Sequence, residues 1–544
     1  MPGFVGGNVA IAGLPRSSFW DNRKGFFLSL LVAMGTFQYN ADTTIINGFQ
    51  AMQGFLRVFG DPTPTGKYKI DTVFQQLITS LLQVGLIVAS AAGLQLGPFS
   101  KHWGRRAGFF VASAIGCVSL LIQIFVTSRP PVYVGRLLLG ISNGGLVNLV
   151  VLWISETSPA HLRGSFVSSF QVFQGIGGII GAVISKAFVN NLTRHSYQLQ
   201  LVVLFAVPIW LMTYSLFWMP ESPRWLATQG RDEEAAKSLR KIRGSHYAEV
   251  HIQTELALIK QAIEAEKEAQ LGASFFDIFK GTDLRRTLLC CGAVTLHASS
   301  GINFLVGYGT VFFQIAAPAS DAFRNTIIFQ CCGFAGAVAA PILAAYVGRK
   351  TLLAWSFGVA TICFLIVGTL NEIFPTKGSG ASNQSSGKTL VSMVCIYIAA
   401  YNVSIGPIAW SVAAEMPSNR LRSLTFGFSM TVGFVAAWLT VFTTPRYLSE
   451  LGPRVSWIWT PSCLLSFLWV VFFLPETQGR TLEELDELFA NRVSAWKFKR
   501  YVCVGGTSTV PTKAGGVSPQ NSSQEKDLDK AEEAREEYVR AVLA

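Results

Sequence analysis

The sequence predicts an all-α membrane protein with about twelve transmembrane helices in two similar six-helix halves. Three observations carry this prediction: few charged residues, apolar runs of membrane-spanning length, and short motifs that occur once in each half. Of 544 residues, 50% are hydrophobic and only 14% are charged, whereas a soluble domain usually has about 25% charged residues. The charges cluster between apolar stretches of roughly 20 residues, the length that crosses a bilayer core.

The apolar runs, divided at charged and turn-forming segments, give twelve spans by hydropathy. The predicted spans are 26–48, 73–98, 108–127, 131–155, 166–190 and 199–219 in the first half and 287–317, 325–346, 351–370, 389–414, 424–447 and 456–474 in the second.

The polar segments outside these spans complete the predicted organisation. The stretch between the halves contains EEAAKSLRKIR and TELALIKQAIEAEKEAQ, which predict amphipathic helices at the cytosolic surface. After residue 490 the chain becomes rich in Gly, Ser, Thr and Pro and then charged, which is typical of a disordered tail. The predicted parts are a cytosolic N-terminal segment, 1–25; an N-terminal bundle, 26–219; a cytosolic helical linker, 220–286; a C-terminal bundle, 287–474; and a cytosolic C-terminal tail, 475–544.

The distribution of positive charge predicts the orientation. The formal net charge of +12 could indicate a nucleic-acid partner in a soluble protein, but here the Lys and Arg residues collect in alternate loops. By the positive-inside rule, both termini lie in the cytosol. We therefore expect a multi-pass protein of the plasma membrane, with the lipid bilayer and no nucleic acid as partner. The loop cations are Arg16, Arg23, Lys24, Lys101, Arg105, Arg106, Arg163, Arg349, Lys350, Arg420 and Arg422.

The nine cysteines form no C-x-x-C pattern, and eight of them lie in apolar spans. This favours buried free thiols over disulfides or metal ligands. The start of the chain lacks a basic region followed by an apolar core, so we expect no cleaved signal peptide. Nor does a polar segment contain a nucleophile–base set, a metal-ligand spacing or a phosphate-binding loop. We expect no cofactor, no metal and no enzymatic activity.

Short motifs recur in the same order in both halves. Such a duplication places a solute site near the membrane midplane, between the halves. The three pairs are Gly104-Arg105-Arg106 with Gly348-Arg349-Lys350, Glu156 seven residues before Arg163 with Glu415 seven before Arg422, and Pro220-Glu221-Ser222 with Pro475-Glu476-Thr477.

Longer segments around these motifs resemble the sugar porter family of the major facilitator superfamily, from about residue 26 to 490. The most specific are PESPRWLATQGRDEEAAKSLRKIRG at 220–244 and PETQGRTLEELDELF at 475–489. GRLLLGISNGG at 135–145, ETSPAHLRGS at 156–165 and GPIAWSVAAEMPSNRLRS at 406–423 support the resemblance. It implies the major facilitator fold, transport by alternating access, and no covalent chemistry.

The resemblance also implies a gating role for charges at the cytosolic helix ends. Such networks hold the outward-open state of the family and break when the cytosolic side opens. The alternative is ordinary topogenic charge with no switching role. The family's usual Asp before each Gly-Arg-Arg is replaced by Lys101 and Ala345, which could weaken this lock. The predicted gating residues are Arg105, Arg106, Glu156, Arg163, Arg349, Lys350, Glu415 and Arg422.

Two ionisable residues fall within predicted spans, where charge is costly and marks an ion path or a paired site. Asp42 lies in the first span, in FQYNADTTIING, and Arg136 opens the fourth. Aligned on the residues that follow it, Asp42 matches the acid of proton-coupled sugar porters, and Arg136 matches their fourth-span Arg. The resemblance implies that protonation releases the carboxylate and biases which face opens. A static structural pair is the alternative, and an alignment shift towards Asn40 would change the assignment.

The predicted solute site departs most from the family pattern. Gln171 and Trp410 match family binding residues, and Gly301, Asn303 and Tyr308 match the seventh-span pattern. The paired glutamines expected before them are His297 and Ala298, the first of two tyrosines is Gly307, and an expected Asn is Ala437. His297 could recognise an anionic or differently hydroxylated solute, or be a buried His bonded to a carbonyl. Polar residues in a bundle can also bond between helices. The candidate substrate-binding residues are Gln171, Gln174, His297, Asn303, Tyr308, Tyr401, Asn402 and Trp410.

Two glycosylation sequons begin at Asn191 and Asn383, in loops expected outside the cell. A third, at Asn521, falls in the predicted cytosolic tail and should not be modified.

Three functions are compatible with the sequence. The first is a proton-linked symporter for a sugar or sugar-like polyol. The second is a facilitator or exporter of a non-sugar solute, such as a cyclic organic acid or a secondary metabolite. The third is a nutrient sensor that signals through its tail. The sequence does not name the solute or the direction of net flux.

Overall fold

The structure is a computed structural model of the chain. It describes residues 22–63, 68–95, 97–159, 162–244, 247–316, 321–373, 381–418, 420–478, 480, 482–498 and 501. These residues belong to one compact unit, Met1–Gly506, and the second unit, Thr507–Ala544, lies outside the description. Most of the predicted N-terminal segment and of the C-terminal tail therefore falls outside the described residues.

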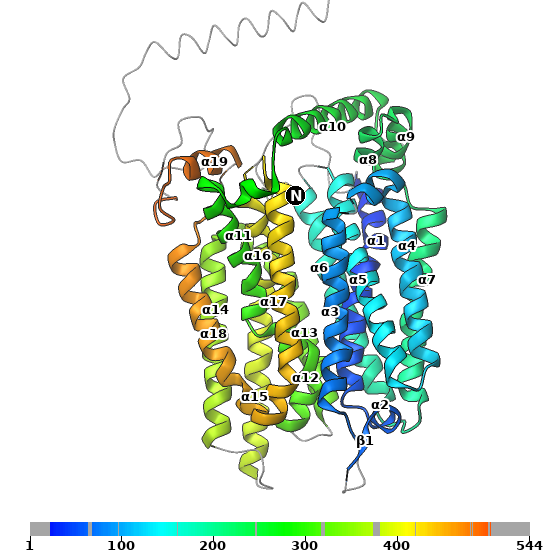
Figure 1. The fold of residues 1–544 in the computed structure, drawn as a ribbon, viewed down its shortest axis with the longest axis vertical. Coiled ribbons are helices and arrows are strands. Elements are labelled where there is room, and N and C mark those ends of the chain that lie inside the picture. The colour runs from blue at the N-terminus through cyan, green and yellow to red at the C-terminus, as the bar shows by residue number, and fades with distance from the viewer. Residues whose placement is uncertain are drawn as a thin grey trace, which may run out of the picture. The chain divides into compact units, whose positions relative to one another are not determined.

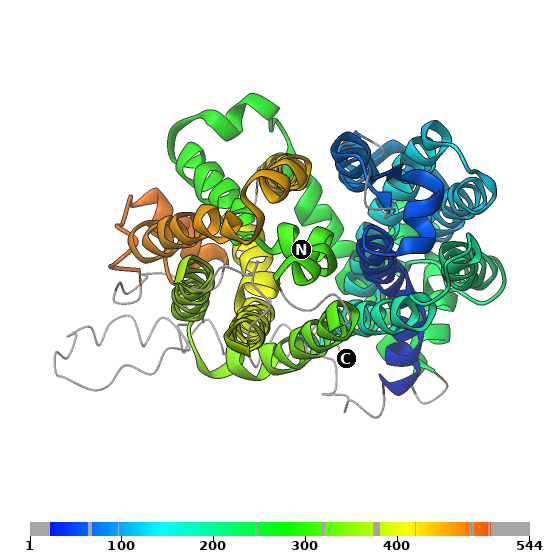
Figure 2. The ribbon, with the colours of Figure 1, turned by 90° about the horizontal axis from the view of Figure 1, so that it is seen from below.

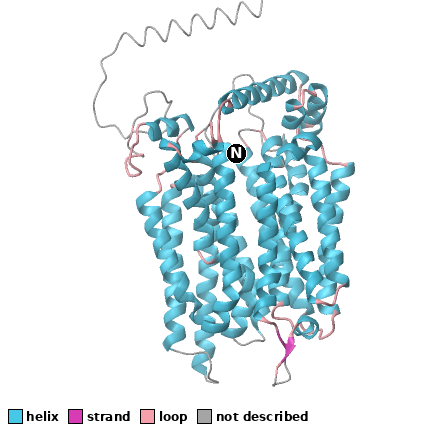
Figure 3. Cartoon of the chain, viewed as in Figure 1, coloured by secondary structure: helices cyan, strands magenta, loops and turns pink. Residues whose placement is uncertain are grey.

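Helices make up nearly all of the described chain, and Figure 3 shows a single small strand pair at one end. That pair is an antiparallel hairpin of β1, Asp61–Pro62, and β2, Tyr68–Lys69. The long helices are α1 Arg23–Phe49, α3 Thr72–Gln95, α4 Gly97–Phe125, α5 Arg129–Thr157, α6 Arg163–Phe188, α7 His195–Phe217, α11 Gly281–Ser299, α12 Ile302–Ala316, α13 Ala322–Tyr346, α14 Arg349–Ile373, α15 Ala381–Ala400, α16 Gly406–Glu415, α17 Arg422–Leu451 and α18 Ser456–Phe473.

Eleven helical segments in the described chain are long and apolar enough to cross a membrane. The first helix, α1, is not among them, although its 27 residues give it ample length. Its second half carries Asn40, Asp42 and Asn47, which lower its hydropathy. With α1 included there are twelve long segments, and the prediction of an all-α membrane protein with about twelve spans is confirmed.

The first and second halves of the chain form two groups of helices that stand side by side (Figures 1 and 2). Short helices lie across one end, which we call the linker end: α8, Pro223–Thr228, α9, Asp232–Arg243, and α10, Glu249–Gln270. The hairpin and α2, Gln53–Phe59, mark the opposite end, which we call the far end. A 3-10 helix, Phe275–Phe279, leads into α11, a second, Gly452–Val455, joins α17 to α18, and α19, Leu482–Ala490, follows α18.

Close approach of glycine-bearing helices brings the polar residues of the first half together. A Cβ atom added at Gly140 of α5 would overlap the backbone of Leu82 and Gly85 on α3. A Cβ atom at Gly177 of α6 would overlap the backbone of Phe37 on α1. A Cβ atom at Gly35 of α1 would lie 2.9 Å from Val150 Cγ2 of α5. Small residues let membrane helices pack this closely, so α1 lies against both α5 and α6.

Two spans of the second half are interrupted. The seventh span is divided into α11 and α12 at Ser300 and Gly301, and Gly301 has a φ of 82°. The tenth span contains a π-helical turn, Tyr401–Ile405, between α15 and α16. Such interruptions change the direction of neighbouring side chains and are frequent at functional sites. Both lie beside candidate solute-binding residues.

Candidate functional site

The buried ion pair of the first half joins α1 to α5. Arg136 Nη1 donates to both carboxylate oxygens of Asp42, at 3.0 and 3.2 Å, and Arg136 Nε donates to the Ile78 carbonyl at 2.8 Å. The Asp42 side chain is 1% exposed and the Arg136 side chain 0%. Asn40 instead donates to the Gln174 carbonyl of α6 at 2.7 Å. Asp42, and not residue 40, therefore faces the fourth-span arginine, while a role in proton coupling remains a prediction.

A cavity lies beside this pair, between the two halves. Residues of both halves line this cavity. Asn303, which the sequence analysis selected, lies in its wall, and its Nδ2 atom has no hydrogen-bond partner among the described residues. The lining residues are Tyr39, Thr43, Ile46, Thr79, Leu82, Gln83, Arg136, Asn303, Val306, Gly307 and Val441.

Four polar lining residues were missed in the sequence analysis: Tyr39, Thr43, Thr79 and Gln83. They come in pairs four residues apart, on the first and second spans. Residues at this spacing share one face of a helix, so the pattern was visible. It does not tell whether the face looks towards a cavity or towards a neighbouring helix.

A second group of candidates meets around the π-helical turn. The His297 ring centroid lies 5.5 Å from that of Tyr401 and 5.5 Å from that of Trp410. Gln171 approaches from the first half: a Cβ atom added at Gly406 would lie 3.4 Å from Gln171 Nε2. The same Cβ atom would lie 3.5 Å from the Tyr401 ring and 3.7 Å from Asn402 Oδ1. Glycine at position 406 thus leaves a small space into which predicted residues from both halves converge.

Tyr308 lies at the far end and its hydroxyl is already engaged. It donates to the Val441 carbonyl at 2.9 Å and makes a short contact with the Thr79 hydroxyl of α3. The side chain is fully buried. Its neighbour Gly307 accepts a hydrogen bond from Gln50 Nε2 of α1 at 3.1 Å. Tyr308 therefore ties the halves together here, while binding of solute by this residue remains a prediction.

Two further hydrogen bonds join α1 and the residues that follow it to α12. Asn47 Oδ1 accepts from the Thr310 amide at 3.1 Å, and Gln314 Nε2 donates to the Ala51 carbonyl at 3.0 Å. These bonds, with those around Tyr308, close the space between the halves at the far end.

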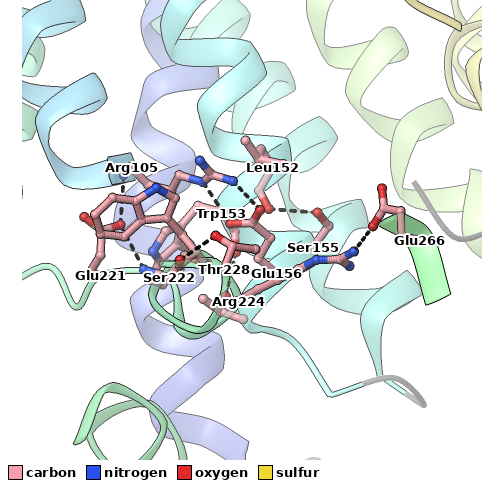
Figure 4. A network of polar contacts seen from close by, with 12 residues as sticks. Arg105, Leu152, Trp153, Ser155, Glu156, Glu221, Ser222, Arg224, Thr228 and Glu266 are labelled. Atoms are coloured by element: carbon pink, nitrogen blue, oxygen red, sulfur yellow. Dashed lines mark hydrogen bonds and ion pairs between the residues drawn. The ribbon is translucent and has the colours of Figure 1, made fainter. Parts of the chain in front are cut away.

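The charged network at the linker end of the first half is formed (Figure 4). Arg105 pairs with Glu156 at 2.7 Å. The Glu221 carboxylate accepts from the backbone amides of Arg105, at 2.8 Å, and Arg106, at 3.2 Å. These amides follow Gly104, where α4 bends with a φ of 84°. Glu221 therefore caps the restarted helix, a role that the sequence analysis did not assign to it.

The second half repeats this network. Arg349 pairs with Glu415, and Glu476 accepts from the backbone amides of Arg349, at 3.0 Å, and Lys350, at 3.2 Å. The Lys350 ammonium lies 4.7 Å from the centroid of the Trp496 ring. The recurring Gly-Arg and Pro-Glu motifs thus meet as equivalent clusters in the two halves.

Arg106, one of the predicted gating residues, bonds to backbone carbonyls. Its guanidinium donates to the Ser215 and Leu216 carbonyls, at 3.0 and 2.6 Å, at the C-terminal end of α7. Positive charge is favourable at this end of a helix. Nearby, burial and then the positive charges of Arg106 and Lys24 lower the pKa of Lys241.

Some predicted site residues are only partly described. The side chains of Arg163 and Asn383 lie outside the description, and Arg422 begins α17. Asn191 lies between α6 and α7, where its Oδ1 accepts from the Thr193 amide and hydroxyl at 3.0 and 2.7 Å. Glycosylation of Asn191 and Asn383 remains a prediction.

Comparison of the sequence with models of known families identifies the family of this chain. The sequence model of the family described as "Sugar (and other) transporter" matches residues 28–489. The chain belongs to this family. The resemblance to sugar porters of the major facilitator superfamily is thereby confirmed, as are membrane transport and the absence of an enzymatic role. The chain is a multi-pass membrane protein.

Curated relatives match nearly the whole chain. Hexose transporter HXT10 of Saccharomyces cerevisiae is 28% identical over 492 residues, which cover 90% of this chain and 89% of the relative. Hexose transporter 2 of Kluyveromyces lactis is 29% identical over 482 residues, 87% of this chain and 84% of the relative.

Solved structures share the fold. The proton:xylose symporter XylE bound to 6-bromo-6-deoxy-D-glucose has a TM-score of 0.67 and 22% identity, over 86% of this chain and all of that chain. An inward open conformation of XylE from E. coli also has a TM-score of 0.67, with 22% identity. At this identity the similarity supports the fold alone.

Proposed function

We propose that this chain carries a sugar or sugar-like polyol across the membrane by alternating access, in symport with protons. The observation that carries the proposal is the Asp42–Arg136 pair, because Arg136 lines the cavity between the halves. A buried charge pair at membrane depth is costly and is kept where ions move. The yeast relatives named as hexose transporters support the sugar as solute.

The mechanism assigns one role to each group of residues. Asp42 accepts the proton, which neutralises the carboxylate, weakens its attraction to Arg136 and lets the halves reorient. Gln171, Gln174, His297, Asn303, Tyr308, Tyr401, Asn402 and Trp410 form the solute site. The linker-end charges hold one state and separate in the other: Arg105, Arg106, Glu156, Arg163, Arg349, Lys350, Glu415 and Arg422.

The proposal places the protein in the plasma membrane with both termini and the linker end in the cytosol, and with Asn191 and Asn383 glycosylated outside. The far-end hydrogen bonds between α1 and α12 would then separate the solute site from the outside.

The test is uptake by the full chain in cells that lack their own hexose carriers. Labelled sugars, polyols and ring acids are offered with and without a protonophore. We expect uptake of a sugar or polyol that collapses when the proton gradient is removed. Asp42→Asn should abolish accumulation against a gradient but retain exchange of solute, because exchange needs no proton release. Asp71→Asn, the same change at the start of α3, is the control and should accumulate normally. Full accumulation by Asp42→Asn refutes the proton site.

A second candidate is transport of a non-sugar solute, such as a cyclic organic acid. The observation in its favour is the aromatic environment of His297, between Tyr401 and Trp410. Sugars need many short hydrogen-bonding groups, and Ala298 supplies none where the family pattern has an amide. Uptake of ring acids but not of sugars in the same panel would favour this candidate.

A further inference from the structure

Two fully buried amide side chains lie in the first half without hydrogen-bond partners. Gln38 on α1 and Asn143 on α5 are each 0% exposed. Neither the oxygen nor the nitrogen of either amide has a partner among the described residues. Buried polar groups are almost always bonded, and an exception calls for a specific cause such as a bound water molecule or ion.

The packing of α1 against α5 places the two amides opposite each other. Asp42 of α1 pairs with Arg136 of α5. Nearer the linker end, about two turns along α1 and three to four turns along α5, a Cβ atom at Gly35 would lie 2.9 Å from Val150 Cγ2 and 3.4 Å from Leu146 Cβ.

The two amides fall between these fixed points. Gln38 is four residues before Asp42 and three after Gly35, whereas Asn143 is seven residues after Arg136 and three before Leu146. Because the two helices run in opposite directions, this register brings Gln38 and Asn143 to the same level on facing sides.

The ion pair contributes a fifth unsatisfied atom. Arg136 Nη2 has no hydrogen-bond partner among the described residues, although Nη1 and Nε of the same guanidinium do. The interface therefore offers donors from Gln38, Asn143 and Arg136 together with two amide oxygens. Water both donates and accepts, and a buried water needs two to four polar partners. The neighbouring guanidinium disfavours a metal cation.

Apolar side chains close the interface towards the linker end. Val32, Leu146 and Val150 are each fully buried, and they belong to one hydrophobic cluster of the first half. A water molecule held here is enclosed and is not part of a channel that continues to the linker end along α1 and α5.

We propose that α1 and α5 enclose bound water between Gln38, Asn143 and the free nitrogen of Arg136. This water completes the hydrogen bonding of the guanidinium, so that Arg136 stays in position when its contact with Asp42 weakens. Gln38 and Asn143 are positioning residues that act on the ion pair through the water. The presence of the water does not depend on which solute the chain carries, whereas its role in holding Arg136 when Asp42 is neutralised rests on the proposed proton coupling.

The deciding experiment is radiolytic hydroxyl-radical footprinting of the purified full chain. Irradiation converts enclosed water into hydroxyl radicals where it is bound. Leu139 and Leu146, which are buried on α5 beside Asn143, should therefore be oxidised in the wild type. The double variant Gln38→Leu/Asn143→Leu should lower this oxidation at least about threefold. Gln200→Leu removes an equally buried amide that is bonded to the Ser196 carbonyl at 2.9 Å and should leave oxidation of the two leucines unchanged.

Thermal unfolding of the same variants gives a second readout. Each single substitution leaves the other amide buried with fewer hydrogen-bond partners, whereas the double substitution removes both amides. The fall in Tm of the double variant should therefore be clearly smaller than the sum of the falls of the two single variants. Absence of oxidation at Leu139 and Leu146 in the wild type overturns the proposal, as do additive falls in Tm.

Discussion

Replacing Glu221 by Gln tests whether one carboxylate supports the linker end of the first half. The carboxylate accepts from three backbone amides: those of Arg105 at 2.8 Å, Arg106 at 3.2 Å and Ser222 at 2.9 Å. A Gln side chain keeps one acceptor oxygen, but its NH₂ group must face an amide donor. The change should therefore remove one hydrogen bond to a charged group, worth about 1.5–3 kcal/mol.

The change also removes negative charge from a helix N-terminus, worth about 0.3–1 kcal/mol. We expect a total loss of roughly 2–3 kcal/mol, because the partly exposed site lowers both contributions. If a half of about 200 residues unfolds as a unit, Tm should fall by roughly 4–8 °C. The assay is thermal unfolding of the purified chain in detergent.

Two further variants make the test specific. Glu264→Gln removes an exposed charge from the middle of α10 and should leave Tm close to that of the wild type. Glu476→Gln removes the equivalent cap of the second half and should lower Tm by a similar amount. A Glu221→Gln variant that melts like Glu264→Gln would refute the capping argument.

Three other substitutions test separate parts of the structure. Tyr308→Phe removes a far-end hydrogen bond worth about 1 kcal/mol, so spin-label distances across that end should shift towards longer values; an unchanged distribution would contradict the closing role. Gly301→Ala places a Cβ atom on a residue with positive φ and 3.0 Å from the Trp459 ring. This strain should destabilise the fold by about 1–2 kcal/mol and lower Tm. An unchanged Tm would show that the break between α11 and α12 tolerates a side chain. Arg243→Gln removes the hydrogen bonds of Arg243 to Glu255 and to an α5 carbonyl and should speed amide hydrogen exchange in α10. Arg240→Gln, which removes an exposed ion pair, should leave exchange unchanged. Equal exchange rates in the two variants would argue that Arg243 does not hold α10 against α5.

The polar pattern of the first span shows how far sequence reasoning reached at the site. A carboxylate within an apolar span already indicated a pair, because an isolated charge there is too costly. Two alignments with the family were possible, and they put the first-span acid of proton-coupled sugar porters at residue 40 or at residue 42. Contacts decided between them: Asp42 meets Arg136, and Asn40 bonds to a backbone carbonyl of α6. Which face of α1 looks towards α5 depends on packing, and local sequence does not encode it.

The repeated motifs show a different limit. Pro220-Glu221-Ser222 and Pro475-Glu476-Thr477 were recognisable as a pair, but their function was not. Glu221 lies 116 residues from the amide of Arg105 that it caps. Hydrogen bonds over such separations depend on where distant helices end in space, so the capping role appeared only in the structure.

The sequence alone determined the class of protein, the number of spans and the two-fold repetition, because these depend on hydropathy, span length and short motifs. The tertiary structure decided which polar residues meet. It placed Arg136 against Asp42 and brought His297 beside Tyr401 and Trp410. It also revealed the breaks at Gly301 and at the π-helical turn. Those features arise from helix rotation and close packing, which are properties of the assembled bundle and not of any single segment.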